Sequence, residues 1–137
     1  MIRDEIKIRV RYSETDKMGY VYYGNYAAYF EVARVEMLRE LGFTYKRMED
    51  EGILLPVADF HIKYIKPAYY DDELTIVIKI TDMPLTKIQF AYETFNQDGI
   101  LLNTAETVLV FVDGKTGRPC RSPQNIQDKA RPYFDSL

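Results

Sequence analysis

The segment 26–41 constrains the fold of this 137-residue chain most strongly, because its apolar side chains follow a helical period throughout. At 100° per residue, one narrow stripe contains Tyr26, Phe30, Ala33, Met37 and Leu41. Much of the remaining circumference is also apolar, through Ala27, Ala28, Val32, Val35 and Leu38. A helix of this kind is usually buried on several sides. We therefore expect this helix, with Asn25 as N-cap and Gly42 just after its end, to lie in the concave face of a strongly curved sheet.

The other periodic segments of the chain predict β-strands. Alternating or β-branched residues occupy five stretches, 6–13, 59–65, 73–80, 86–96 and 100–112. The last four are joined by short connections, of which Asp98-Gly99 is a strong hairpin signal, so antiparallel pairing is expected. Residues 14–25 are predicted to form a loop, 45–51 a short helix, and 119–137 a loose extension. One helix against such a sheet predicts a single α+β domain over residues 1–137.

Composition and charge exclude several classes of protein. The chain is 47% apolar and 28% charged, which is ordinary for a folded domain and excludes disorder as the main state. A net charge of -3 without a basic run argues against nucleic acid as the principal partner. The first residues lack the apolar core of a signal peptide, and no uncharged apolar run reaches the ~18 residues of a membrane span. A cytoplasmic protein is therefore expected.

The chain contains one cysteine, Cys120, and one histidine, His61. A single residue of each type can form neither an intrachain disulfide nor a zinc site of the Cys/His kind. A serine triad or a Cys–His pair would have to recruit His61, which alternates with Asp59 and Lys63 on the polar side of a predicted strand. We therefore expect His61 to be a structural or surface residue, and no metal or cofactor is expected.

Residues around the start of the helix follow the pattern of a known family. The segment 10–34, VRYSETDKMGYVYYGNYAAYFEVAR, places Gly19 three residues after Asp16 and carries Glu31 and Arg34 on the helix. Two later segments read HIKYIKPAYYDDELTI and VLVFVDGKTGRPCRSP. Together they resemble the hotdog-fold thioesterases of the 4-hydroxybenzoyl-CoA thioesterase and YbgC-like type. The resemblance implies a curved five-stranded sheet wrapped around one long central helix, and hydrolysis of a small, medium-chain or aryl acyl-CoA to free acid and coenzyme A.

The resemblance also implies catalytic roles for two residues. Asp16 would attack the thioester carbonyl, or activate the water that attacks it. The backbone N–H of Tyr23, at the start of the helix, would polarise the carbonyl oxygen. Many YbgC-like proteins have histidine where this chain has Tyr23, so only the backbone role carries over. Considered by residue type alone, Asp16 would be an ordinary loop aspartate that stabilises a turn before Gly19.

Further positions are expected to bind the substrate, namely Asn25, Tyr26, Thr86 and Lys87. The last two would contact the phosphates of coenzyme A, for which Lys63 and Lys66 are further basic candidates. Aromatic residues make up 14% of the chain and favour an aryl substrate slightly. Glu31 and Arg34 are expected to form an i,i+3 ion pair that holds the helix to the sheet or to a second subunit.

Other functions stay open at this point. Hydrolysis of an acyl group on acyl carrier protein, a hotdog hydratase and a non-enzymatic acyl-CoA-binding module are the alternatives. Hydratases of this fold generally use a catalytic histidine, and the presence of Asp16 favours an enzyme over a binding module. Because a small curved sheet leaves a long edge strand open, we also expect a homodimer that assembles further into a homotetramer.

Overall fold

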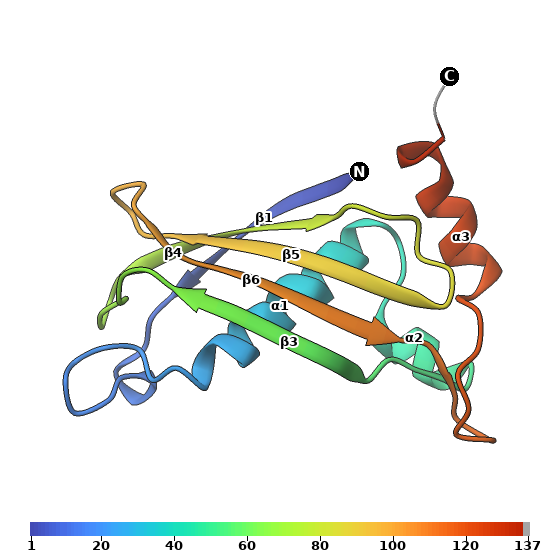
Figure 1. Cartoon of the computed structure of the whole chain (residues 1–137), viewed down its shortest axis with the longest axis horizontal. Helices are drawn as coiled ribbons and strands as arrows, with labels where there is room; N and C mark the ends of the chain where they lie inside the picture. Colours follow the sequence, from blue (N-terminus) through green and yellow to red (C-terminus); the bar gives the residue numbers. More distant parts are fainter. Residues whose placement is uncertain (136–137) are drawn as a thin grey trace.

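Five strands form one antiparallel sheet in the order β1-β4-β5-β6-β3 in the computed structural model, which describes residues 1–135 (Figure 1). The strands are β1 (Ile2–Arg9), β3 (Val57–Tyr64), β4 (Glu73–Ile80), β5 (Lys87–Phe95) and β6 (Leu101–Val110). The long helix α1 (Asn25–Glu40) lies against one face of this sheet, and α2 (Tyr45–Asp50) follows it. The short strands β2 (Ile53–Leu54) and β7 (Val112–Asp113) pair separately. The predicted α+β class is confirmed.

The buried face of α1 packs on the inner face of the sheet. Phe30 is 0% exposed, and its ring stacks on Tyr92 of β5 with 4.3 Å between ring centroids. Ala33 and Met37 continue the same buried stripe along the helix. The opposite side of α1 stays open, and Val32 is 45% exposed. The prediction that this helix is buried on several sides is therefore wrong for a single chain, because one sheet covers only one side of α1.

One charged side chain of α1 is buried, and hydroxyl groups surround it. Arg34 donates from Nε to the hydroxyl of Tyr45 at 3.2 Å and from Nη1 to that of Tyr92 at 3.1 Å. The Tyr92 oxygen lies 2.6 Å from Oγ1 of Thr107 on β6. Burial raises the pKa of Tyr92 although the Arg34 cation opposes this, so the hydroxyl stays neutral. Arg34 thus ties helix to sheet.

The predicted ion pair between Glu31 and Arg34 is wrong for the chain described here, since no carboxylate of residues 1–135 lies within 4.0 Å of Arg34. Glu31 is exposed, whereas the guanidinium of Arg34 turns under α1 towards the sheet. Three residues advance a helix by about 300°, so the two side chains start only about 60° apart around the axis. The pair is absent because the hydroxyls of Tyr45 and Tyr92 take up the Arg34 guanidinium.

Two segment boundaries differ from the sequence prediction. The first strand covers Ile2–Arg9 instead of 6–13, since β1 pairs with β4 from Ile2 opposite Ile80 to Arg9 opposite Glu73. The tail contains the helix α3 (Gln124–Ala130), whose buried Ile126 and Ala130 dock it on the core. A helix of only seven residues makes about two turns, which is too few to give a clear helical period in the sequence. Residues 136–137 of the predicted tail lie outside the described residues.

The stacked contact between α1 and β5 gives the first testable prediction. Phe30→Ala should lower the free energy of unfolding by about 3–5 kcal/mol, because it removes a fully buried ring and leaves a cavity. Val32→Ala on the exposed side of the same helix should stay within about 0.5 kcal/mol of wild type. Urea titration followed by circular dichroism measures both. Equal losses in the two variants would contradict the assigned orientation of α1.

Candidate active site

The loop before α1 folds into a small hairpin that docks on the segment after β3. The backbone N–H of Asp16 donates to the carbonyl of Tyr20 at 2.7 Å. Val21 donates its N–H to the carbonyl of Ala68 at 2.8 Å, so the hairpin is fixed to the sheet. At its tip, Gly19 has φ +84°, a conformation that side chains of L-residues rarely adopt. The loop is thus held in one shape at the point where Asp16 emerges.

Glu14 fixes the other side of this loop to α1. Its carbonyl accepts hydrogen bonds from the Tyr22 N–H at 2.9 Å and from Asn25 Nδ2 at 2.7 Å. Its carboxylate accepts from the Tyr29 hydroxyl at 3.0 Å and from the Arg11 backbone N–H at 2.8 Å. Although burial acts to raise it, the pKa of Glu14 lies below its ordinary value because these donors and the Arg11 cation favour the charged form. An ionised Glu14 therefore positions the loop.

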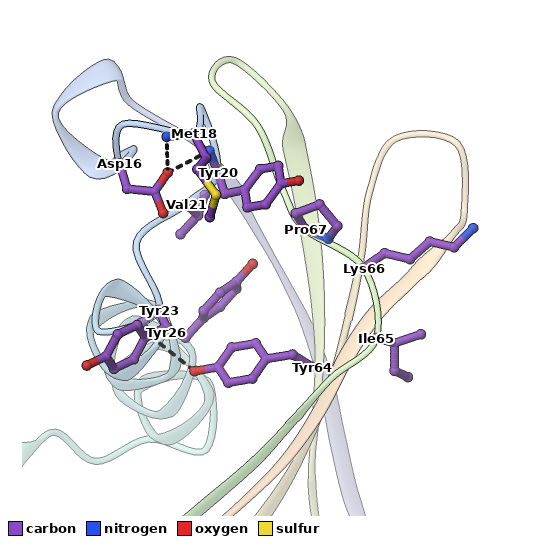
Figure 2. Close-up of a pocket in the computed structure, with 10 residues that line it drawn as sticks. All are labelled: Asp16, Met18, Tyr20, Val21, Tyr23, Tyr26, Tyr64, Ile65, Lys66 and Pro67. Atoms are coloured by element: carbon purple, nitrogen blue, oxygen red, sulfur yellow. Dashed lines mark hydrogen bonds between the residues drawn. The ribbon is translucent and has the colours of Figure 1, made fainter.

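Asp16 uses one carboxylate oxygen for a turn and keeps the other for a second role. Its Oδ1 accepts hydrogen bonds from the backbone N–H groups of Met18 at 2.9 Å and Tyr20 at 3.1 Å. Oδ2 makes no hydrogen bond within residues 1–135. Figure 2 shows the carboxylate on one side of a pocket and the rings of Tyr23 and Tyr26 on the other. The turn role and the catalytic role are therefore compatible in this residue.

The pocket beside Asp16 has a volume of about 410 Å³ and largely apolar walls. It is lined by Asp16, Met18, Tyr20, Val21, Tyr23, Tyr26, Tyr64, Ile65, Lys66 and Pro67. The rings of Tyr26 and Tyr64 lie 5.8 Å apart, and the Tyr64 hydroxyl donates to the Tyr23 carbonyl at a long 3.5 Å (Figure 2). Aromatic walls with one carboxylate and one lysine suit a flat apolar group attached to an anionic carrier.

The N-terminus of α1 faces this pocket. The N–H groups of Asn25 and Tyr26 donate to the carbonyls of Tyr22 and Tyr23, whereas the N–H of Tyr23 has no partner within residues 1–135. A free N–H just before a helix start, reinforced by the helix dipole, suits a developing negative charge. Asp16 and Tyr23, which were expected to act together, thus both line this pocket.

Three other predicted binding residues lie elsewhere. Asn25 holds the loop by its bond to Glu14 and does not line the pocket. Thr86 and Lys87 are exposed at the start of β5, at the opposite end of the sheet from Asp16. Within one chain they are remote from the pocket.

Tyr26 and Lys66 line the pocket, whereas Lys63 lies on the outer face of β3 beside His61. His61 is exposed, in agreement with the sequence analysis. No group of three or more histidine, cysteine, aspartate or glutamate side chains within residues 1–135 is arranged to hold a metal ion.

Two residues that sequence reasoning missed lie behind the pocket wall. Thr94 and Asn103 are 0% exposed, and Thr94 Oγ1 and both amide atoms of Asn103 have no hydrogen-bond partner within residues 1–135. A buried polar group without a partner costs about 1–3 kcal/mol. The sequence offers one signal, an asparagine within the strand predicted at 100–112, a residue type that strands disfavour, but it does not tell which face of the strand Asn103 occupies.

Burial also raises the pKa of Tyr26 to about 12, with a smaller contribution from the neighbouring Tyr64. The backbone of Ala68 and the amide of Asn103 act in the opposite direction, so the Tyr26 hydroxyl lies close to the Asn103 amide. At physiological pH the hydroxyl is therefore neutral and able to donate a hydrogen bond.

The chain belongs to the thioesterase-like superfamily, which matches residues 10–130. It is 37% identical to the acyl-CoA thioester hydrolase YbgC of Escherichia coli over 87% of this chain and 89% of that protein. It is 38% identical to YneP of Bacillus subtilis, with 89% and 88% covered. A DHNA-CoA thioesterase structure from Staphylococcus aureus superposes with a TM-score of 0.89 at 37% identity, covering 97% of this chain and 89% of that one. The predicted hotdog fold, family and enzyme class are confirmed.

None of the helices within residues 1–135 combines the length and the hydropathy needed to cross a bilayer.

The Glu14 network gives a prediction for the pH dependence of stability. Because the folded-state pKa of Glu14 lies below the ordinary value of 4.5, its stabilisation is present at neutral pH and is lost as the pH falls below that value. Glu14→Gln should therefore melt below wild type at pH 7, and the difference in Tm should shrink in this acid range. Differential scanning calorimetry at several pH values measures this. A difference in Tm that is constant with pH would contradict an ionised Glu14.

Proposed function

We propose that the protein hydrolyses acyl-CoA thioesters to a free acid and coenzyme A. The observation that carries this proposal is the arrangement of Asp16 and the free Tyr23 N–H on one aromatic pocket. Oδ2 of Asp16 attacks the thioester carbonyl or takes a proton from the water that attacks it. The Tyr23 N–H donates to the carbonyl oxygen as negative charge develops there. The carbon–sulfur bond then breaks, and the thiolate of coenzyme A leaves and takes up a proton. Where Asp16 itself is the nucleophile, water then hydrolyses the acyl-aspartyl anhydride, which releases the free acid and restores the carboxylate.

Two features support coenzyme A as the carrier. Lys66 lines the pocket that contains Asp16, where its ammonium group can pair with a phosphate. The YbgC and Staphylococcus aureus relatives are both named for hydrolysis of a coenzyme A thioester. The aromatic side chains around Asp16 favour an aryl or medium-chain acyl group in the pocket.

A homodimer paired through β3 explains several exposed residues. Every residue of β3 is exposed or half-buried, including the large apolar side chains of Val57 and Phe60. The other edge strand, β1, carries five charged residues, which discourage pairing. Antiparallel pairing of two β3 strands would also bring the start of the partner's β5, with its own copies of Thr86 and Lys87, towards the Asp16 end of this chain. Their predicted contact with coenzyme A phosphates therefore depends on the dimer. A homotetramer and a cytoplasmic location stay predictions.

Replacement of Asp16 tests the catalytic role. Asp16→Asn should lower kcat/KM for acyl-CoA hydrolysis at least about 100-fold, because a neutral amide is neither a nucleophile nor a base. The amide oxygen still accepts from Met18 and Tyr20, so the turn and the Tm should be retained. Release of free thiol from short, medium, long and aryl acyl-CoAs provides the assay.

Asp113→Asn is the matched control, since Asp113 Oδ1 also caps a turn by accepting from the N–H of Lys115 at 2.8 Å. This variant should keep wild-type activity. Equal rates in wild type and Asp16→Asn would remove Asp16 from the mechanism. An enzyme that binds acyl-CoA without hydrolysing it would indicate a binding module or a carrier-protein substrate.

Light scattering after size-exclusion chromatography tests the assembly. The particle should have two or four times the 16.1 kDa mass of the chain. Val57→Lys on the exposed edge should shift it towards the monomer, because a lysine at a sheet edge opposes pairing. Leu85→Lys, at an exposed leucine of a loop, serves as the control and should not. A wild-type particle of one chain mass would refute the dimer.

A further inference from the structure

The two groups proposed to react with the thioester lie on separate parts of the loop before α1. The carboxylate of Asp16 belongs to the hairpin, whereas the Tyr23 N–H lies just before the helix. Between them the chain turns at Gly19, whose φ is +84°. A misplacement of about 1 Å between reacting groups can cost about 100-fold in rate. The side chains that hold the two parts together can therefore control catalysis without touching the substrate.

The carbonyl of Glu14 is the point at which the two parts of the loop meet. It accepts hydrogen bonds from the Tyr22 N–H at 2.9 Å and from Nδ2 of Asn25 at 2.7 Å. The backbone N–H of Asn25 also donates to the Tyr22 carbonyl at 2.9 Å. Since the Tyr22 carbonyl and the Tyr23 N–H belong to one planar peptide group, these bonds fix the direction of that N–H. Asn25 thus holds both the donor peptide and the chain that leads to Asp16.

The carboxylate of Glu14 forms a second connection to α1, one turn further along the helix. Its Oε1 accepts a hydrogen bond from the Tyr29 hydroxyl at 3.0 Å. Residues four apart lie on the same side of a helix, so Asn25 and Tyr29 both face Glu14. Tyr29 is buried, so water competes little for this bond. The ion pair of Glu14 with Arg11, whose side chain is 76% exposed, adds little by comparison.

We propose that Asn25 and Tyr29 are positioning residues for hydrolysis and that they act through Glu14. Together the three residues hold the carboxylate of Asp16 at a fixed distance from the Tyr23 N–H. None of the three lines the pocket, so they align the reacting groups without binding the acyl group. This inference rests on the proposed acyl-CoA thioesterase function and adds the residues that position its two reacting groups. Loss of the alignment should therefore appear in kcat and not in substrate affinity.

Replacement of the two helix residues tests their role. Asn25→Ala and Tyr29→Phe should each lower kcat about 10- to 100-fold for the acyl-CoA that wild type hydrolyses fastest. Their Kd values for the non-hydrolysable thioethers octyl-CoA and phenacyl-CoA, measured by calorimetric titration, should equal those of wild type. Wild-type kcat in both variants would overturn the proposal, and so would a loss confined to thioether binding.

Tyr45→Phe is the matched control for Tyr29→Phe. It also removes a tyrosine hydroxyl that is bonded to another side chain, here Nε of Arg34 at 3.2 Å. Tyr45 lies on α2, near the opposite end of α1 from the Asp16 loop (Figure 1). This variant should lower Tm and keep wild-type kcat, because a hydrogen bond is lost away from the reacting groups. An equal loss of kcat in Tyr45→Phe and Tyr29→Phe would assign the effect to stability and refute the positioning role.

Changes at Glu14 test whether Tyr29 acts through it. Glu14→Ala should lower kcat, and adding Tyr29→Phe should cause no further loss, because the bond between the two side chains is already absent. Glu14→Gln should recover most of the loss, since its side-chain oxygen can still accept from the Tyr29 hydroxyl and the Arg11 N–H, which both donate to Oε1. Additive losses in the double variant, or equal losses in Glu14→Ala and Glu14→Gln, would refute the connection.

The Asp16→Asn variant separates this inference from the proposed function. An inactive Asp16→Asn beside fully active Asn25→Ala and Tyr29→Phe would refute the positioning role and leave the proposed function intact. A wild type that hydrolyses no acyl-CoA would refute the proposed function, and this inference with it. Should Glu14→Ala fail to fold, Asn25→Ala and Tyr29→Phe decide.

Discussion

The packing of α1 on the inner face of the sheet is the interaction on which the rest of the structure depends. Phe30 and Tyr92 form a stacked pair at its centre, and burial of such aromatic surface is the main source of stability in a chain of this size. The same contact fixes where the helix begins. Since α1 begins beside the end of β3, Tyr23, Tyr26 and Tyr64 form one side of a pocket that the Asp16 loop completes.

Buried polar side chains have hydrogen-bond partners on one side of the core and lack them on the other. Towards α2, Arg34 has hydroxyl partners on Tyr45 and Tyr92, so the buried cation is solvated by the protein and binds helix to sheet. Towards the pocket, Thr94 and Asn103 lack partners within residues 1–135. Satisfied networks stabilise a core, whereas unsatisfied groups cost free energy and persist where another role maintains them.

The predictions from sequence were accurate where a local pattern is tied to one geometry. The period of residues 26–41, the hairpin at Asp98-Gly99 and the order of the strands led to the correct class of fold. The loop motif at Asp16 was placed correctly beside the helix start. The direction of Arg34 was wrong, because residues three apart on a helix can turn either to solvent or to the sheet, and only packing decides between them. The tail helix α3 was missed because two turns carry too little pattern.

The sequence by itself determined the family, the central helix and the identity of the loop carboxylate, since these follow from periodicity and from a motif within 25 consecutive residues, 10–34. Only the tertiary structure decided which side chains meet across the sheet. Tyr64, Thr94 and Asn103 are remote in sequence, yet the strand register places them in one row across β3, β6 and β5. Register depends on all the pairings of the sheet at once, and a shift of one residue would turn each of these side chains to the other face.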